Sequence, residues 1–319
     1  MARAPYRLRG FAPFAEVERN KPINDLIGEM LSLLSKGLLK LAIKLIQALP
    51  SPIAICAVGR AIGIIAYYIV HRWRVRALQN LNLVFGDKLS IQRKLEIAKK
   101  NFKHLGCLVC EMGWDSVRHG IPLHSWVRFH GLKHIDEALS IGNGVIIVTA
   151  HLGNWALLCR VLRQIGYKVH PVIRMPSNEA AREALIMLMR QYDVSWIPTP
   201  PNTEAVKNCL RLLRRGEIVC LLVDRRAGGL MLDFLGLPAL TAVGAATLHI
   251  RTGAPLLPVF ILRSGYRHDV FVLPKMKFEF AGDYESTVRL ITQAINDLLS
   301  EWILRYPEQW LWIHRRWRL

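Results

Sequence analysis

The sequence predicts an α/β fold, with a mostly parallel sheet flanked by helices and an N-terminal helical membrane anchor. Beyond residue 131, short β-branched and apolar runs alternate with amphipathic segments, as in chains that form parallel sheets. Earlier in the chain, residues 53–70 are almost entirely apolar and are followed by the basic stretch HRWRVR. These patterns divide the chain into an anchoring region, residues 1–75, and an α/β domain, residues 76–319.

The charge balance indicates anionic partners. The 319 residues include 43 Lys and Arg against 24 Asp and Glu, a formal net charge of +19. Such a charge suits nucleic acid, anionic lipid or an acidic carrier protein. Because the mean hydropathy is positive and the basic residues are interleaved with apolar ones and nine tryptophans, we expect a lipid surface and no nucleic acid.

The anchoring region contains two apolar segments. Residues 26–49 have apolar side chains at helical spacing beside a stripe of lysines, a pattern typical of a helix lying in a membrane interface. Residues 53–70 are short for a spanning helix, and Arg60 would be costly at the centre of a bilayer. We therefore expect a membrane-embedded or surface-bound anchor whose basic end faces the cytoplasmic leaflet. Core helices of a soluble protein are the alternative.

The α/β domain is expected to begin with a helix over residues 76–118, in which Ser90 caps a run through Glu111. Ligands of parallel sheets bind at the carboxyl ends of the strands, and His151 directly follows the first strand. Strands are predicted at residues 144–150, 168–173, 194–198, 217–223, 254–262 and 268–274, and later helices at 155–165, 178–191, 203–214, 242–252 and 284–304.

The six cysteines are scattered through apolar segments, which predicts reduced core residues in a protein facing the cytosol. Cys107 and Cys110 form a CxxC pattern, but it lies in a helical segment without a second pair. We expect no metal site and no redox role for it.

The stretch TAHLGNWALL, residues 149–158, places His151 where a catalytic base could act. Acyl transfer to an alcohol needs such a base, a group that holds it in one tautomer, and donors for the developing oxyanion. A hydrogen-bonded structural histidine in a turn is the alternative, and this stretch alone does not separate the two.

Several spaced motifs together resemble one family. They are RVRALQNLNLVFGD, HLGNW, RMPSN, LLVDRRAGGLMLDFLGLPALTAVGAATLHIRTGAPLLPVFILR and PEQWLWIHRRW, in order over about residues 70–317. The chain in this respect resembles the late acyltransferases of lipid A biosynthesis, the lauroyl and myristoyl transferases, within the wider glycerolipid acyltransferase superfamily.

The resemblance implies a bacterial inner-membrane enzyme with its catalytic domain on the cytoplasmic side. It would move a fatty acyl chain from an acyl carrier protein thioester to a hydroxyl of a lipid A precursor or a related anionic lipid. We expect no cofactor, because the thioester is already activated and the sequence has no metal-ligand cluster or P-loop.

The family's His-x4-Asp/Glu motif falls on His151, with Asn154 and Trp155 as candidate substrate contacts, but its acidic position falls on Ala156. Loss of an orienting acid costs orders of magnitude in related catalytic machinery. The chain is then a variant crippled to retain substrate, a natural inactive paralogue, or an active enzyme that recruits another acid. The intact surrounding motifs favour the first, so we expect correct substrate placement with reduced turnover.

Further candidates lie at other strand ends. Arg174 matches a basic position after the second strand and could hold a phosphate or the oxyanion, or be a solvated loop residue. Asp224 is a candidate substrate contact, or a structural helix cap or partner of Arg174. The family usually has Asp-Gln here, and Arg225 replaces the Gln.

The resemblance adds further substrate contacts in the second half of the chain. Gly236 is expected in a tight turn under the acceptor site, and His314, Arg315 and Arg316 match a His-Arg-Arg motif. The alternation of tryptophans with basic residues in this tail suits a membrane interface or the phosphates of lipid A. A solvated basic end is the alternative.

Other functions also fit the sequence. The same fold and histidine would serve a lysophospholipid or other glycolipid acyltransferase, because these differ in the acceptor pocket. A non-catalytic lipid-binding protein would explain Ala156 as true loss of activity.

Overall fold

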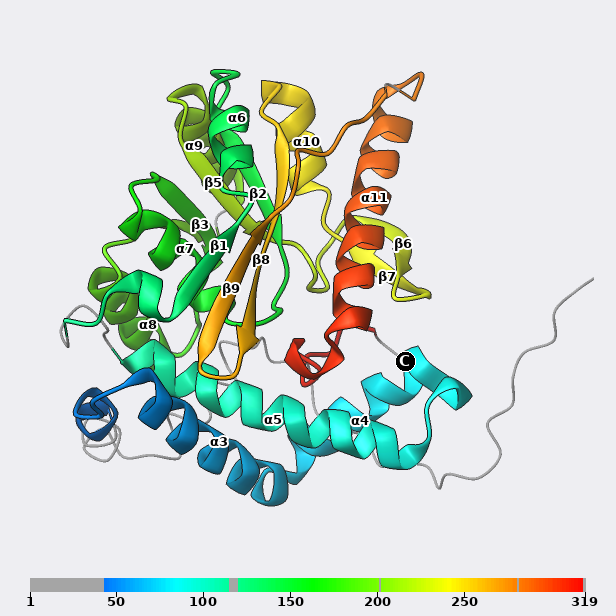
Figure 1. Ribbon diagram of the computed structural model, residues 1–319. Helices are drawn as coiled ribbons and strands as arrows, with labels where there is room; N and C mark the ends of the chain where they lie inside the picture. The colour runs from blue at the N-terminus through cyan, green and yellow to red at the C-terminus, as the bar shows by residue number, and fades with distance from the viewer. Residues whose placement is uncertain (1–42, 115–119, 201, 280, 318–319) are drawn as a thin grey trace, which may run out of the picture.

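The computed structural model describes residues 43–317, except residues 115–119, 201 and 280 (Figure 1). Most of the helix expected over residues 26–49 lies outside the described residues. The remainder confirms the α/β class, with a mostly parallel sheet covered by helices.

The central sheet has seven strands in the order β1-β9-β8-β2-β5-β3-β4. All neighbours are parallel except β8 and β9, which pair antiparallel through a tight hairpin. A separate hairpin is formed by β6 and β7. The strands are β1 (Val127–His130), β2 (Val145–Thr149), β3 (Val169–Arg174), β4 (Ile197–Thr199), β5 (Ile218–Leu222), β6 (Leu230–Phe234), β7 (Leu237–Thr241), β8 (Leu256–Ser264) and β9 (Arg267–Val272).

Helices cover both faces of the sheet, as the wholly buried pattern of β2 requires. Ile146 and Val148 pack in one core with α9, α10 and α11. Val145 and Ile147 point the opposite way and pack with α6, α7 and α8. These helices are α6 (Lys133–Leu139), α7 (Trp155–Gln164), α8 (Glu179–Gln191), α9 (Asn202–Arg214), α10 (Gly244–Thr252) and α11 (Tyr284–Arg305).

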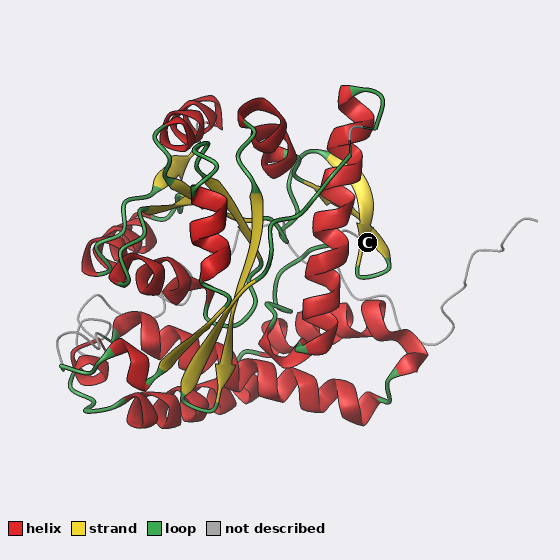
Figure 2. Ribbon diagram, turned by 45° about the horizontal axis from the view of Figure 1, so that its top comes forward, coloured by secondary structure: helices red, strands yellow, loops and turns green. Residues whose placement is uncertain are grey.

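Three more helices, α3 (Pro52–Ile69), α4 (His71–Phe85) and α5 (Ile91–Gly113), lie across one end of the sheet (Figures 1 and 2). The backbones of α3 and α5 touch at small residues: a Cβ on Gly59 would lie 2.4 Å from the Cα of Cys107, and one on Gly63 would lie 2.2 Å from the carbonyl oxygen of Phe102. The expected domain boundary at residue 75 falls inside α4.

Within the described residues, α3 alone is long and apolar enough to cross a bilayer, and 28% of it is buried. Its outer face carries exposed apolar side chains, including Ile53, Ile65 and Ile69, the last 74% exposed. Arg60 is also exposed.

One expectation about helices is corrected. The single helix expected over residues 76–118 is two helices, because the chain turns at Gly86, which has a φ of 46°, and restarts at Ser90. Ser90 caps α5 as predicted, its side chain accepting from the amide of Arg93.

The other differences concern strands. The strand expected at residues 194–198 is only Ile197–Thr199, and β1, β6 and β7 were not anticipated. Gly236 does lie in a tight turn, because Leu235 and Gly236 both adopt positive φ between β6 and β7. All six cysteines are buried thiols, as expected of core residues.

Candidate active site

The carboxyl ends of three adjacent parallel strands carry the candidate residues. His151 follows β2, Asp224 follows β5, and Arg174 ends β3. Since β5 pairs with β2 on one side and β3 on the other, all three residues lie along one sheet edge, as the sequence predicted.

His151 and Asp224 form a hydrogen-bonded pair. The Nδ1 of His151 lies 2.8 Å from Oδ1 of Asp224, and the backbone amide of His151 donates to Oδ2 at 3.0 Å. The side chain of Asp224 is 1% exposed and that of His151 is 11% exposed. Because a carboxylate accepts the Nδ1 hydrogen, Nε2 of His151 is left as the proton acceptor.

Asp224 is held ionised although it is buried. Burial opposes ionisation, but the neighbouring His151 and the hydrogen bonds from His151 and Trp310 keep the pKa of Asp224 well below its usual range. Among the described contacts, the side chain of Asp224 pairs with His151 and Trp310, and none of these contacts is a helix cap or a bond to Arg174.

Trp310 completes the surroundings of this acid. Its Nε1 donates to Oδ2 of Asp224 at 2.8 Å. The sequence predicted that the tail tryptophans face a membrane interface or the phosphates of lipid A, but Trp310 and Trp312 are 1% and 0% exposed and pack edge to face. Asparagines of α4 and α5 hold this tail inward, since the side-chain amides of Asn80 and Asn101 donate to the carbonyls of Trp312 and Trp310.

The turn after His151 is tightly constrained. Gly153 has a φ of 63°, and a Cβ there would lie 1.6 Å from the carbonyl oxygen of Ile261, so only glycine fits. Asn154 caps α7 by accepting from the amide of Leu157, and its Nδ2 donates to Glu111. Asn154 is 1% exposed, so both ends of this predicted substrate contact are used inside the protein.

The next two positions border the histidine. Trp155 is half-buried, and its ring meets that of His151 at 5.1 Å in a T-shaped arrangement. Ala156 follows in the first turn of α7 and is half-buried.

Comparison with known proteins agrees with this geometry. Residues 30–319 match the family model described as bacterial lipid A biosynthesis acyltransferase. The chain belongs to this family.

Individual relatives are similar over most of the chain. A lipid A biosynthesis palmitoleoyltransferase of Escherichia coli is 28% identical over 287 residues, 85% of this chain and 86% of the relative. The E. coli lipid A biosynthesis lauroyltransferase is 25% identical over 86% of this chain and 88% of its own length. A phosphatidylinositol mannoside acyltransferase of Mycobacterium tuberculosis is 30% identical over 59% of this chain and 58% of its own length.

The three residues of the C-terminal His-Arg-Arg motif lie in different environments. Arg316 is 0% exposed, and its guanidinium donates to the carbonyl of Leu240 and, at 2.8 Å, to the hydroxyl of Thr241. Burial lowers the pKa of Arg316 to about 10, while Asp224 opposes the shift. Arg316 therefore ties the tail to β7, and Arg315 beside it is half-buried.

His314 has a different environment. Its Nε2 is buried and has no hydrogen-bond partner among the described residues. Burial, then the nearby charge of Arg225, holds the pKa of His314 well below its usual range, so its imidazole is neutral.

Basic side chains gather on this rim of the acyltransferase. Arg174 is exposed and Arg225 is half-buried. Burial lowers the pKa of Arg225, with the charge of Arg174 acting in the same direction and Asp224 opposing it. Two cations so placed suit an anionic group of a substrate.

A cavity of about 540 Å³ lies elsewhere, at the amino ends of β3 and β5. Its lining includes Lys168, Val169 and Glu217, which precede or begin these strands. Because His151 and Asp224 lie at the opposite strand ends, this cavity is not part of the candidate active site.

Two residues of the site were missed from the sequence. Trp310 lies in the C-terminal motif PEQWLWIHRRW, but nothing in the sequence indicates that its indole reaches Asp224. Glu111 offered a weak signal, an acidic residue among apolar ones in a long helix.

Proposed function

We propose that this protein is an O-acyltransferase that moves a fatty acyl chain from an acyl carrier protein thioester to a hydroxyl of a lipid A precursor. The observation that carries the proposal is the pair formed by His151 and Asp224 at the carboxyl edge of the sheet. Family membership supplies the reaction class, and similarity to transferases of lipid A biosynthesis supports the acceptor.

In the proposed mechanism, Nε2 of His151 takes the proton from the attacking hydroxyl as its oxygen adds to the thioester carbonyl. Asp224 fixes the tautomer and stabilises the imidazolium that forms. Collapse of the tetrahedral intermediate expels the carrier's thiolate, which takes the proton, and leaves an ester on the lipid.

Asp224 thus fills the role that the family motif gives to the position of Ala156. Of the three alternatives left open by the sequence, this geometry supports an active enzyme that recruits another acid. A crippled enzyme would instead need His151 to lack a carboxylate partner, whereas the Nδ1 to Oδ1 distance is 2.8 Å.

We assign substrate contacts on the same rim. Arg174 would hold a phosphate of the donor or acceptor, or the oxyanion, and Arg315 is proposed as a further substrate contact. The neutral His314, whose Nε2 has no hydrogen-bond partner in the described part of the chain, would donate a hydrogen bond to substrate. Trp155 would border the reacting groups. Asn154 and Arg316 would hold backbone segments near the site through their side chains, and Gly236 would form the turn between β6 and β7.

We further propose that α3 docks this end of the molecule onto the cytoplasmic face of a bacterial inner membrane. Its exposed face combines apolar side chains with Arg60, and the basic stretch of residues 71–76 follows. Flotation with vesicles that contain anionic phospholipid tests this placement. Protein that remains in the unbound fraction would contradict it.

The function is tested with radiolabelled acyl-acyl carrier protein and membranes containing a tetra- or penta-acylated lipid A precursor. The wild type should form acylated product, and His151→Ala should form none above background because the base is lost. Equal product from both proteins, or product from neither, counts against the proposal.

A second acceptor class is favoured by one observation, the 30% identity to a phosphatidylinositol mannoside acyltransferase. The same assay with a glycosylated phosphatidylinositol and with a lysophospholipid separates these acceptors. Tight lipid binding without turnover on any acceptor would support a non-catalytic lipid-binding protein.

A further inference from the structure

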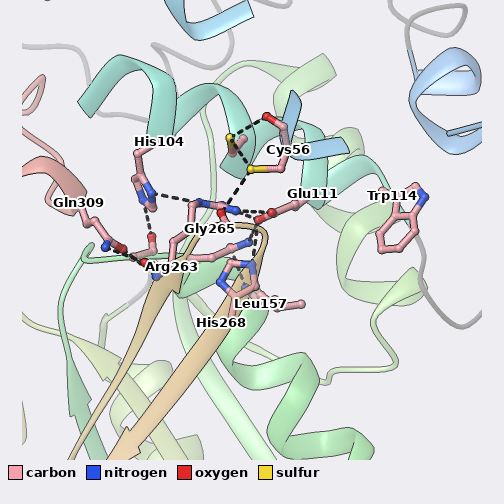
Figure 3. A network of polar contacts seen from close by, with 12 residues as sticks. Cys56, His104, Glu111, Trp114, Leu157, Arg263, Gly265, His268 and Gln309 are labelled. Carbon is pink, nitrogen blue, oxygen red and sulfur yellow. Dashed lines mark hydrogen bonds and ion pairs between the residues drawn. The ribbon is translucent and has the colours of Figure 1, made fainter. Parts of the chain in front are cut away.

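A network of polar contacts joins α5 to the strands β8 and β9 of the sheet (Figure 3). Glu111 of α5 accepts hydrogen bonds from both terminal nitrogens of Arg263, a residue of β8. Nη2 of Arg263 lies 2.6 Å from Oε2 of Glu111. The side chains of Glu111 and Arg263 are only 5% and 7% exposed. His268 of β9 lies against the same carboxylate, its Nε2 being 3.2 Å from Oε2.

The network holds a charged pair where burial favours neutral groups. Burial opposes ionisation of Glu111, but Arg263 and His268 keep its pKa well below the usual range. Glu111 in turn raises the pKa of Arg263 against the effect of burial. A buried ion pair adds little stability compared with apolar packing. The segments that this pair holds in place therefore indicate its role.

It holds the turn that carries the catalytic base. Asn154 lies three residues beyond His151, and its Nδ2 donates to Oε2 of Glu111 at 2.6 Å. Nε of Arg263 lies 3.3 Å from Nδ1 of His104, which makes Nδ1 the acceptor and places the hydrogen of His104 on Nε2. That Nε2 therefore donates to the carbonyl of Gly153 at 3.1 Å.

We propose that Glu111 is a positioning residue for acyl transfer, which acts through Asn154 to hold the His151 turn against α5. The inference rests on the proposed function, because it takes His151 as the base. The two bonds from α5, to Gly153 and from Asn154, fix the segment between the base and α7. A carboxylate is required at position 111 because Oε2 accepts from Asn154 and Arg263 while Oε1 accepts from the other terminal nitrogen of Arg263, whereas an amide always places a donor against Arg263.

The test compares Glu111→Gln and Asn154→Ser with the wild type. Glutamine keeps the shape but loses the charge, and serine keeps the cap of α7 while its hydroxyl is too short to reach Glu111. Each variant should lower kcat by about 10- to 100-fold with KM changed by less than about twofold, because a small misplacement of a catalytic group has this cost. Asn154→Ser leaves the ion pair with Arg263 intact, so it serves if Glu111→Gln does not fold.

Lys94→Met is the matched control. Lys94 is also buried in α5, and it donates to Asn82 at 2.8 Å without touching the turn. Thermal unfolding in detergent gives the folded fraction of each protein. The control should keep the wild-type kcat per folded molecule, even where its unfolding temperature falls as far as that of Glu111→Gln.

The double variant Glu111→Gln with Asn154→Asp tests the link itself. It reverses the donor of the hydrogen bond between the two positions, and it returns an anion to the site beside Arg263. We expect it to raise kcat about tenfold above Glu111→Gln alone. No recovery, or single variants with kcat within about twofold of the wild type, would overturn the proposal.

A readout that does not need acyl transfer separates this inference from the function it rests on. Carbethoxylation of His151 by diethylpyrocarbonate, followed by mass spectrometry, should be several times faster in both single variants. His134 on α6 serves as the internal reference. Unchanged labelling of His151 would overturn the positioning role, whereas wild-type protein without acyl transfer on any acceptor would refute the proposed function.

Discussion

Asp224→Asn replaces the carboxylate that accepts three hydrogen bonds at the strand edge. Oδ2 accepts from the amide of His151 and from the indole of Trp310, while Oδ1 accepts only from Nδ1 of His151. An asparagine can keep the two bonds at the Oδ2 position only if its oxygen lies there. Its NH2 group then faces Nδ1 of His151 and donates to it.

The magnitude follows from this orientation. Donation to Nδ1 places the imidazole hydrogen on Nε2, so His151 can no longer take the proton of the attacking hydroxyl. A wrong tautomer of this kind lowers kcat by about 10⁴ in a serine protease, and we expect a fall of about 10³- to 10⁴-fold here. That corresponds to about 4 to 5.5 kcal/mol of activation free energy.

The assay is steady-state acyl transfer from acyl carrier protein to lipid acceptor in detergent micelles, which gives kcat. Asp233→Asn in β6 is the matched control, because it is the same substitution at an exposed aspartate that accepts from the amide of Gly236. If folded Asp224→Asn keeps kcat within about tenfold of the wild type, Asp224 is not the orienting acid.

Two further outcomes are expected. Ala156→Glu should leave kcat unchanged or lower it, because Nδ1 of His151 already donates to Asp224; a gain of about tenfold or more in the same assay would show that the wild type lacks an orienting acid. Burial, assisted by the charge of Arg263, lowers the pKa of His104 to about 3. Between pH 3 and about pH 6.5, the unfolded chain therefore binds a proton at this histidine that the folded protein does not bind. The free energy of unfolding consequently falls as the pH falls through this range. His104→Gln should therefore reduce the loss of stability between pH 6.5 and 5 by up to about 1.4 kcal/mol per pH unit, measured by thermal unfolding, with His268 and His314 retaining part of the slope. An unchanged slope would contradict this account of His104.

Strand and helix positions in the α/β domain followed closely from local pattern. The buried strand β2 and the amphipathic helices α7, α9 and α11 lie within about two residues of the expected ranges, because burial on two faces and helical periodicity leave clear patterns. Pattern did not reveal β1 or the hairpin of β6 and β7. The alternation in these short strands is weak, and their pairing depends on β9 and on a turn with positive φ at Leu235.

The tail shows the same limit in another form. Alternating tryptophan and arginine has one composition whether it faces lipid or a protein core. Asn80 and Asn101 decide the matter, because they bind backbone carbonyls of the tail more than 200 residues away and hold Trp310 and Trp312 inside.

The sequence by itself determined the α/β class, the edge of the sheet where chemistry would occur, and His151 as the candidate base, because strand ends and local motifs are properties of neighbouring residues. Only the tertiary structure decided which acid partners that base. Asp224 is 73 residues from His151, and the two meet because β2 and β5 pair in parallel register. The His-x4-Asp/Glu motif has a fixed short spacing, so it predicts the acid at Ala156. A parallel sheet instead brings together the ends of strands that can be separated by any length of chain.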